Sequence, residues 1–490
     1  MASDRTKARI FSNTAWLTAG TIVNTLIGLY ITRALARYLG VADYGLYTLA
    51  FVYLNFTAVI ANFGFDPILL REAARDKEGT SALLTAGIVL KLLFAVPALA
   101  AGAAYLLARD FPPGYTAAVV CLLLTHFVSA FDTYEVVHRA RLWGGTPAMA
   151  SVLFQALTLG VVLWGRARGW PLEWLIASHL LVRAARAGFL YLRLRAQMAV
   201  HWRWDRGRAL FILRESWVIG LTGILWVIYF RVDTLMLEWM KGPEAVGEYA
   251  AAYKFIELSL LGSGLLIASL GPLLAERWPA NPTGFGRLFQ ETVDYMGAAG
   301  ALVAGTLLVF SADLIRFIFS PSFAEAVSML RVLALAAPVI YLANTFGHVM
   351  VATGAQGSGF LTTRVTAALL NVLLNLWWIP RWGGHGAAWA TVLSEAAVLL
   401  IAPWFIRRKT GELPRFWTPL LAAAAAGLAW LACRAAGGGA EAATWPGRLA
   451  GGGVLAAGLL LFFLARRRHL AELVQQLRSR RPAPIEAPPA

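Results

Sequence analysis

The sequence reads YLGVADYGLY at residues 38–47 and MKGPEAVGEY at residues 240–249, so one short pattern of glycine and tyrosine occurs twice. At a constant offset of 202 residues the same residue types recur, namely Gly40 with Gly242, Gly45 with Gly247 and Tyr47 with Tyr249. The apolar segment before each copy keeps this offset without a gap, pairing Thr14 with Ser216, Thr18 with Gly220, Thr21 with Gly223 and Thr32 with Thr234. A single matched pair could be two interfacial turns, but a register of this length predicts an internal duplication.

The segments around the pattern are long and apolar. Of the 490 residues, 59% are hydrophobic and only 14% are charged, with a mean hydropathy of +0.62; a soluble domain has about 25% charged residues. Apolar runs long enough to cross a bilayer recur throughout, which predicts an all-α polytopic membrane protein with about 14 transmembrane helices. The expected spans are 12–32, 44–65, 82–108, 115–137, 147–165, 172–192, 213–238, 249–274, 291–311, 328–352, 360–380, 385–406, 416–435 and 447–465.

The duplication divides these spans into two six-helix lobes related by a parallel repeat, because an even number of spans separates the two copies. We expect an N-terminal lobe at 1–205, a second lobe at 206–410, two extra transmembrane helices at 411–470 and a basic, Pro- and Ala-rich tail at 471–490. Disorder is predicted from Arg481 onward. The repeated pattern is then the outer turn between the first two helices of each lobe, where it contacts no substrate.

The charge pattern sets the orientation. With both termini in the cytoplasm, most Lys and Arg fall in cytoplasmic segments, including the dense cluster from Arg193 to Arg214. This asymmetry explains the net charge of +16 without a nucleic acid, although the basic tail could also contact anionic lipid. Cys121 and Cys433 lie in apolar stretches and predict neither a disulfide nor a metal site. No cleavage site follows the N-terminus, which we interpret as the start of the first span.

Polar residues within the expected spans are the candidates for binding. Thr21 and Thr25 lie on one helical face, which suits either a small-residue packing seam or the hydroxyl-lined wall of a cavity. Arg231 lies on the matching face of the second lobe and is the leading candidate for an anionic head group, unless it snorkels to the helix end. Lys91 lies about ten residues into its span, where it needs a cavity or a partner.

Further charged residues are candidates for ion coupling or gating. Asp233 cannot share the face of Arg231 and is expected to pair with another span, whereas Lys254 and Glu257, three residues apart, could form a local ion pair. Lys254 is also a candidate for the substrate cavity. Asp66 with Arg71, at the cytoplasmic end of one span, suit gate ion pairs or ordinary interfacial charges. Asp132 with Glu135, at the cytoplasmic end of another span, could carry protons or be satisfied by neighbouring helices or water.

Several motifs are missing from the sequence. It has no P-loop, no HExxH and no cluster of His or Cys, so we expect no cofactor, no metal and no enzymatic activity. The glycine-rich stretch TGAQGSG at 353–359 follows no strand and is a weak signal for a phosphate loop.

With its fourteen expected spans and duplicated lobe, the chain resembles the polysaccharide-transport branch of the multidrug/oligosaccharidyl-lipid/polysaccharide exporter superfamily. The likeness is carried by FSNTAWLTAG at 11–20, ARYLGVADYGLYTLA at 36–50 and FRVDTLMLEWMKGPEAVGEYAAAYKFIEL at 230–258. It implies a flippase that moves undecaprenyl-diphosphate-linked oligosaccharide across the bacterial inner membrane by alternating access. The implied partners are this lipid, the membrane and other polysaccharide assembly proteins, with the chain working as a monomer. A cationic cavity would be formed by Arg231, Lys254 and Lys91.

Other functions remain open on the sequence. A flippase for the peptidoglycan lipid precursor has the same architecture, and a drug exporter of the superfamily usually has fewer spans. A membrane glycosyltransferase or polysaccharide ligase generally carries a large loop for its chemistry, and no such loop is evident here. A structural scaffold would have no need for cations inside the membrane.

Overall fold

The computed structural model describes residues 2–354, 359–436 and 444–479, and the side chains of these except 2–15, 463, 465 and 467–479. The described residues form helices joined by short turns and loops, with no strand among them. The helices are α1 (Ala2–Asn62), α2 (Phe65–Arg75), α3 (Thr80–Leu107), α4 (Pro113–Leu123), α5 (Thr125–Ser129), the 3₁₀ helix η1 (Ala130–Asp132), α6 (Thr133–Ala140), α7 (Gly145–Arg168), α8 (Leu172–Arg195), α9 (Arg206–Lys241), α10 (Pro243–Arg277), α11 (Pro282–Ile318), α12 (Ala324–Ala334), α13 (Ala336–Ala352), α14 (Leu361–Thr410), α15 (Trp417–Ala435) and α16 (Trp445–Ser479). The tail from Arg481 and most of TGAQGSG lie outside the described residues.

The helices supply the expected membrane crossings. Within the described residues, 11 helices are long and apolar enough to span a bilayer, and α12 with α13 forms a twelfth span bent by 44°. Both α1 and α14 are two spans joined across a glycine kink, at Gly40 and Gly383. The chain is therefore an all-α, multi-pass membrane protein with about fourteen crossings, as the sequence predicts.

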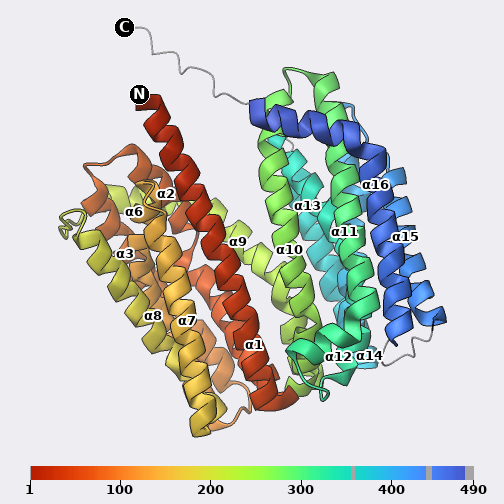
Figure 1. Ribbon diagram of the computed structural model, residues 1–490. Helices are drawn as coiled ribbons and strands as arrows, with labels where there is room; N and C mark the ends of the chain where they lie inside the picture. The colour runs from red at the N-terminus through yellow and green to blue at the C-terminus, as the bar shows by residue number, and fades with distance from the viewer. Residues whose placement is uncertain (1, 355–358, 437–443, 480–490) are drawn as a thin grey trace. The chain divides into compact units, whose positions relative to one another are not determined.

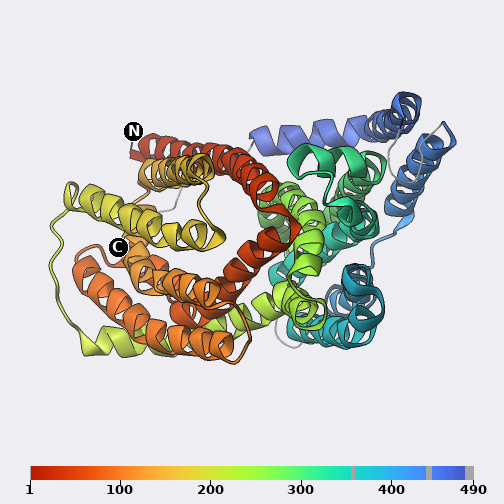
Figure 2. The same cartoon turned by 90° about the horizontal axis from the view of Figure 1, so that it is seen from below.

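The repeated pattern takes the same backbone conformation in both copies. Gly40 has φ 76° and ψ −173°, and Gly242 has φ 83° and ψ −178°. This region of the Ramachandran map is open essentially only to glycine. The kink at Gly40 turns α1 sharply between its two arms, as Figure 2 shows. The junction is a bend between helices with almost no loop, and its glycines allow that bend.

Contacts divide the chain into two compact units. The first comprises residues 1–254, 314–329 and 364–394, and the second comprises 255–313, 330–363 and 395–490. In the first unit α1 packs along α7 (Figure 1), and α4 packs against α8. Its core includes a cluster around Phe65, Leu69 and Ile212, formed by α2, α3, α6 and α9. In the second unit α15 packs against α16.

Candidate functional site

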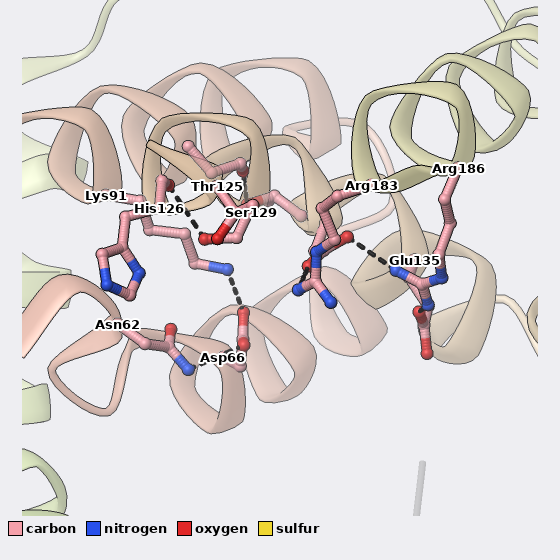
Figure 3. A network of polar contacts seen from close by, with 12 residues as sticks. Asn62, Asp66, Lys91, Thr125, His126, Ser129, Glu135, Arg183 and Arg186 are labelled. Atoms are coloured by element: carbon pink, nitrogen blue, oxygen red, sulfur yellow. Dashed lines mark hydrogen bonds and ion pairs between the residues drawn. The ribbon is translucent and has the colours of Figure 1, made fainter. Parts of the chain in front are cut away.

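A buried lysine on α3 forms an ion pair with α2. Lys91 Nζ lies 2.5 Å from Asp66 Oδ1, and Asn62 Nδ2 donates to Asp66 Oδ2 at 2.9 Å (Figure 3). The Lys91 side chain is only 5% exposed, whereas that of Asp66 is 38% exposed. An ammonium group inside a span is stable only with such a partner or with water. Of the two alternatives that the sequence left for Lys91, a cavity or a partner, the structure shows a partner, Asp66.

The span at Pro113–Ala140 is broken into short segments, and its acidic side chains contact a neighbouring helix, α8. The hydroxyls of Thr125, Ser129 and Thr133 each donate to the carbonyl three residues earlier, at 2.6 to 2.8 Å. Such bonds compete with the regular α-helical pattern and favour a tighter 3₁₀ turn. The 3₁₀ turn η1 ends at Asp132, and Glu135 lies in the first turn of α6.

Two arginines of α8 hold these carboxylates. Arg186 Nη1 donates to Asp132 Oδ1 at 2.7 Å and its other Nη bonds Glu135, while Arg183 bonds Asp132 (Figure 3). Arg139, which lies on α6 together with Glu135, forms an ion pair with it at 2.5 Å. The sequence analysis identified Asp132 and Glu135 but missed Arg183 and Arg186. Two arginines three residues apart in an apolar span are the signal that could have identified them.

A histidine lies between this network and α1. His126 is 3% exposed, and its Nε2 lies 2.7 Å from Thr57 Oγ1. The Thr57 hydroxyl itself donates to Tyr53 O at 2.8 Å. Figure 3 shows His126 near Lys91 and Asn62. The network in this unit thus draws polar groups from α1, α2, α3, α5, η1, α6 and α8, all inside a bundle of spanning helices.

A second polar site surrounds Asp233 on α9. Its Oδ2 accepts from Tyr249 at 2.6 Å, and its Oδ1 accepts from the Thr234 amide at 2.7 Å. Tyr249 lies 3.4 Å from Thr391 on α14, so the carboxylate is linked to two further helices. Asp233 is 4% exposed. The expectation that Asp233 bonds another span agrees with this arrangement.

The other predicted residues lie in varied surroundings. Arg231 is half-buried on α9, with an electrostatic attraction to Asp233. Lys254 and Glu257 are half-buried on α10 and both make interactions.

Of the remaining predicted residues, Thr21 is exposed, whereas Thr25 and Arg71 are half-buried. Thr21 and Thr25 donate to the carbonyls of Leu17 and Thr21, at 2.8 Å each, so their hydroxyls are used within α1. Arg71 bonds Glu72 and Glu215 at 2.7 and 3.1 Å, near the surface. No group of three or more His, Cys, Asp or Glu suited to a metal ion occurs in the part of the chain that the structure describes.

Similar structures define the class of fold. A structure described as "Lipid II flippase MurJ, inward closed conformation" has a TM-score of 0.70 at 13% identity, covering 93% of this chain and 99% of that chain. An inward-facing multidrug resistance MATE family transporter of the MOP superfamily has a TM-score of 0.60 at 14% identity, covering 79% and 95%. A MOP superfamily transporter from Pyrococcus furiosus also has a TM-score of 0.60, at 17% identity and covering 82% and 96%. The protein therefore has the fold of the MOP-superfamily transporters.

The sequence comparisons define the family. Residues 10–277 match the family described as "Polysaccharide biosynthesis protein", which is more than half of the chain. The chain belongs to this family, and the resemblance to the polysaccharide-transport branch is confirmed. A probable multidrug resistance protein of Bacillus subtilis, YoeA, is 29% identical over 129 residues, which is 25% of this chain and 28% of that protein's length.

Proposed function

We propose that this protein is a flippase that translocates undecaprenyl-diphosphate-linked oligosaccharide from the cytoplasmic to the outer leaflet, for the synthesis of cell-surface polysaccharide. The membership of the polysaccharide biosynthesis family and the transporter fold support a cargo that is lipid-linked and crosses the bilayer. In this proposal the chain lies in the bacterial inner membrane with both termini in the cytoplasm. It works as a monomer beside other polysaccharide assembly proteins.

The Lys91–Asp66 ion pair is the observation that carries the proposal. Lysine and arginine within spans are costly, and a diphosphate head group is the cargo chemistry that they suit. Asp66 is the more exposed partner, so a diphosphate arriving from that side replaces one anion by another at Lys91. The buried ammonium then has a partner in both the empty and the loaded states. Arg183 and Arg186 of the same network carry guanidinium groups that suit bidentate phosphate contacts.

Arg231, Lys254 and the threonine face of Thr21 and Thr25 complete the proposed cargo site. Asp233 and Glu257 are the proposed coupling groups, and Asp66, Arg71, Asp132 and Glu135 the proposed gate. Asp233 suits the coupling role because it is buried and bonded to Tyr249 of another helix. Binding of a proton or of sodium there would change the charge at a contact between helices. That change is the kind of event that shifts a transporter between two conformations.

A flippase for the peptidoglycan lipid precursor is the second candidate, since the solved structure with a TM-score of 0.70 is described as a lipid II flippase. Both cargoes carry a diphosphate on a polyprenyl chain, so the same cations serve either one. A membrane glycosyltransferase or polysaccharide ligase is the alternative from another class of protein.

The test is transport in reconstituted vesicles. Each cargo, with a fluorescent label on its glycan, is incorporated, and its movement between leaflets is followed by a quencher added outside. We expect the protein to flip the oligosaccharide lipid, and Arg231→Ala to lower the rate at least tenfold while the protein still inserts. Arg214→Ala, an exposed arginine of the same helix, is the matched control and should flip at the normal rate.

The outcomes separate the claims. Normal flipping by Arg231→Ala would remove Arg231 from the site but leave the function in place. Transport of lipid II alone would favour the second candidate. If the wild-type protein moves neither lipid, and a deletion strain accumulates no lipid-linked glycan, the proposed function is wrong.

A further inference from the structure

A groove on the first unit lies outside the network described above. It has a volume of about 910 Å³, near the upper end of the roughly 300–1,000 Å³ of small-molecule sites. Its walls come from the N-terminal part of α1, the start of α7 and the end of α8, and Figure 1 shows α1 running along α7 here. The walls are mostly apolar, with Trp16, Leu142, Trp143 and Met149 among them, and Arg193 and Gln197 supply polar groups.

The turn that forms one wall is strained. Leu142 has φ 58°, the left-handed region that a leucine rarely adopts. The Leu142 amide bonds Arg139 O at 3.0 Å and the Trp143 amide bonds His138 O at 2.8 Å, which is the Schellman pattern at the end of α6. Glycine normally occupies this left-handed position, and two glycines follow directly at 144 and 145.

The strain has a consequence for the groove. A leucine in the left-handed position costs stability that a glycine would not. The Leu142 side chain is 38% exposed and lines the groove, so burial in the protein core does not repay that cost. Backbone strain of this kind tends to persist where a side chain has a functional use. Because the Leu142 side chain lines the groove, the functional use open to it is contact with a ligand inside the groove.

The groove lies at the end of the spans that carries the basic cluster. Arg193 begins the Arg193–Arg214 segment and is exposed. Two tryptophans beside it are typical of the depth where lipid head groups meet acyl chains. An apolar groove that has one guanidinium group among its lining residues matches a lipid whose head group is anionic.

We propose that this groove binds one anionic phospholipid, with its phosphate on Arg193 and an acyl chain against Leu142, Trp143 and Met149. This lipid is a resident ligand of the transporter, separate from the cargo and from the Lys91 network. Its site goes beyond the proposed function, because it requires neither flipping nor a glycan.

The test measures lipid binding to the purified, full-length protein by native mass spectrometry. Phosphatidylglycerol is titrated against phosphatidylcholine, and we expect a clear preference for the anionic lipid. Arg193→Gln should weaken phosphatidylglycerol binding about fivefold, the factor that corresponds to the ~1 kcal/mol gained by one arginine at an anionic surface. Arg195→Gln, an exposed arginine two residues on, is the matched control and should change binding less than twofold.

The Leu142→Gly variant distinguishes a loss of lipid binding from a loss of folding. The substitution relieves the left-handed strain, so the melting temperature should stay the same or rise, while lipid binding weakens. Ala19→Trp should also weaken binding, because Ala19 lines the groove and the indole fills it. Ala104→Trp, on an exposed face of α3, is its control.

The proposal is overturned by equal affinity for the two phospholipids, by equal effects of Arg193→Gln and Arg195→Gln, or by unchanged binding in Leu142→Gly. Displacement of phosphatidylglycerol by undecaprenyl phosphate at lower concentration would also overturn it, by assigning the groove to the cargo's carrier. None of these readouts depends on transport, so a failure here leaves the proposed flippase function untouched.

Discussion

Gly45 and Gly247, the same position in the two copies of the repeat, pack each against the backbone of the other copy. A Cβ atom on Gly45 would lie 1.9 Å from Pro243 O, and a Cβ on Gly247 would lie 2.2 Å from Val41 O. The contact is reciprocal, so the two junctions meet as a pseudo-symmetric pair within the first unit. The repeated glycine is therefore needed for close approach between helices as well as for the local turn.

Gly45→Ala should destabilise the protein. The added methyl group overlaps a carbonyl oxygen, which is backbone and cannot move aside cheaply, so we expect a loss of about 1–3 kcal/mol in the free energy of unfolding. Thermal unfolding in detergent micelles measures it. Gly188→Ala is the matched control, because a Cβ there meets nothing within 4 Å and alanine favours the helix. Equal melting temperatures for the two variants would contradict the close contact.

The Lys91–Asp66 pair should respond unequally to the loss of either partner. Asp66→Asn leaves a cation that is 5% exposed without its counter-charge, and we expect a cost of about 3 kcal/mol. Lys91→Met leaves Asp66, which is 38% exposed and still bonded to Asn62, so its cost should be clearly smaller. Denaturant unfolding of both variants and of the double variant gives the coupling energy. A larger cost for Lys91→Met would show that the buried charge is not what limits stability.

Asp76 should make stability fall at acid pH. The Gly79 amide, which donates to Asp76 Oδ1 at 2.7 Å, and then the Arg208 guanidinium at 2.8 Å hold the pKa of this carboxyl below its usual value. A lowered folded-state pKa gives stability that is present above the unfolded pKa of about 3.9 and is lost as the pH falls through the folded pKa. Asp76→Asn should therefore lower the melting temperature at pH 7 and flatten its decline below about pH 4.

The control for this pH dependence is Glu78→Gln, a neighbouring exposed carboxylate of the same loop. It should leave the acid decline unchanged. An unaltered pH profile in Asp76→Asn would mean that other carboxylates cause the decline.

Of the two ion pairs that join α16 to α11, the one made by Arg466 should contribute more to stability. Arg466 bonds Asp294, whose side chain is 1% exposed, and Arg448 bonds Asp313, 34% exposed, at 2.5 Å. Arg466→Gln leaves a buried carboxylate without its cation and should cost more stability than Arg448→Gln. Hydrogen exchange along α16 and thermal unfolding measure the difference. Faster exchange in Arg448→Gln than in Arg466→Gln would reverse the order that we expect.

Much of the fold followed from the sequence because its signals are local. Hydropathy runs predict the spans, and the glycine positions mark the bends at Gly40 and Gly242, where only glycine tolerates the backbone. The close approach of Gly45 to Gly247 did not follow, because it joins residues about two hundred positions apart. A glycine required for bending and one required for contact look alike in a sequence.

The candidate site was less accessible from the sequence. The depth of Lys91 in its span showed that it needs a cavity or a partner, but nothing local selected Asp66 from among the acidic residues. Tyr249 as the partner of Asp233 was hidden for the same reason, since it lies on a different helix. The argument applied to Lys91, that a cation inside a span needs a cavity or a partner, also applies to Arg183 and Arg186 and could have identified them. The break that turns Asp132 toward them depends on hydroxyl bonds whose choice of acceptor the sequence leaves open.

Gly40 and Gly242, which form the bends, differ from Gly45 and Gly247, which form the contact, in the reason why other residues are excluded. At Gly40 and Gly242 a Cβ would meet nothing within 4 Å, so what excludes other residues there is the chirality of L-amino acids. A semisynthetic protein with D-alanine at these two positions should fold as well as the natural chain, or better, because the mirror-image residue prefers that backbone and has fewer unfolded conformations. An ordinary mutational scan would score all four glycines as equally intolerant. Only a change of chirality would separate the positions that must bend from those that must touch.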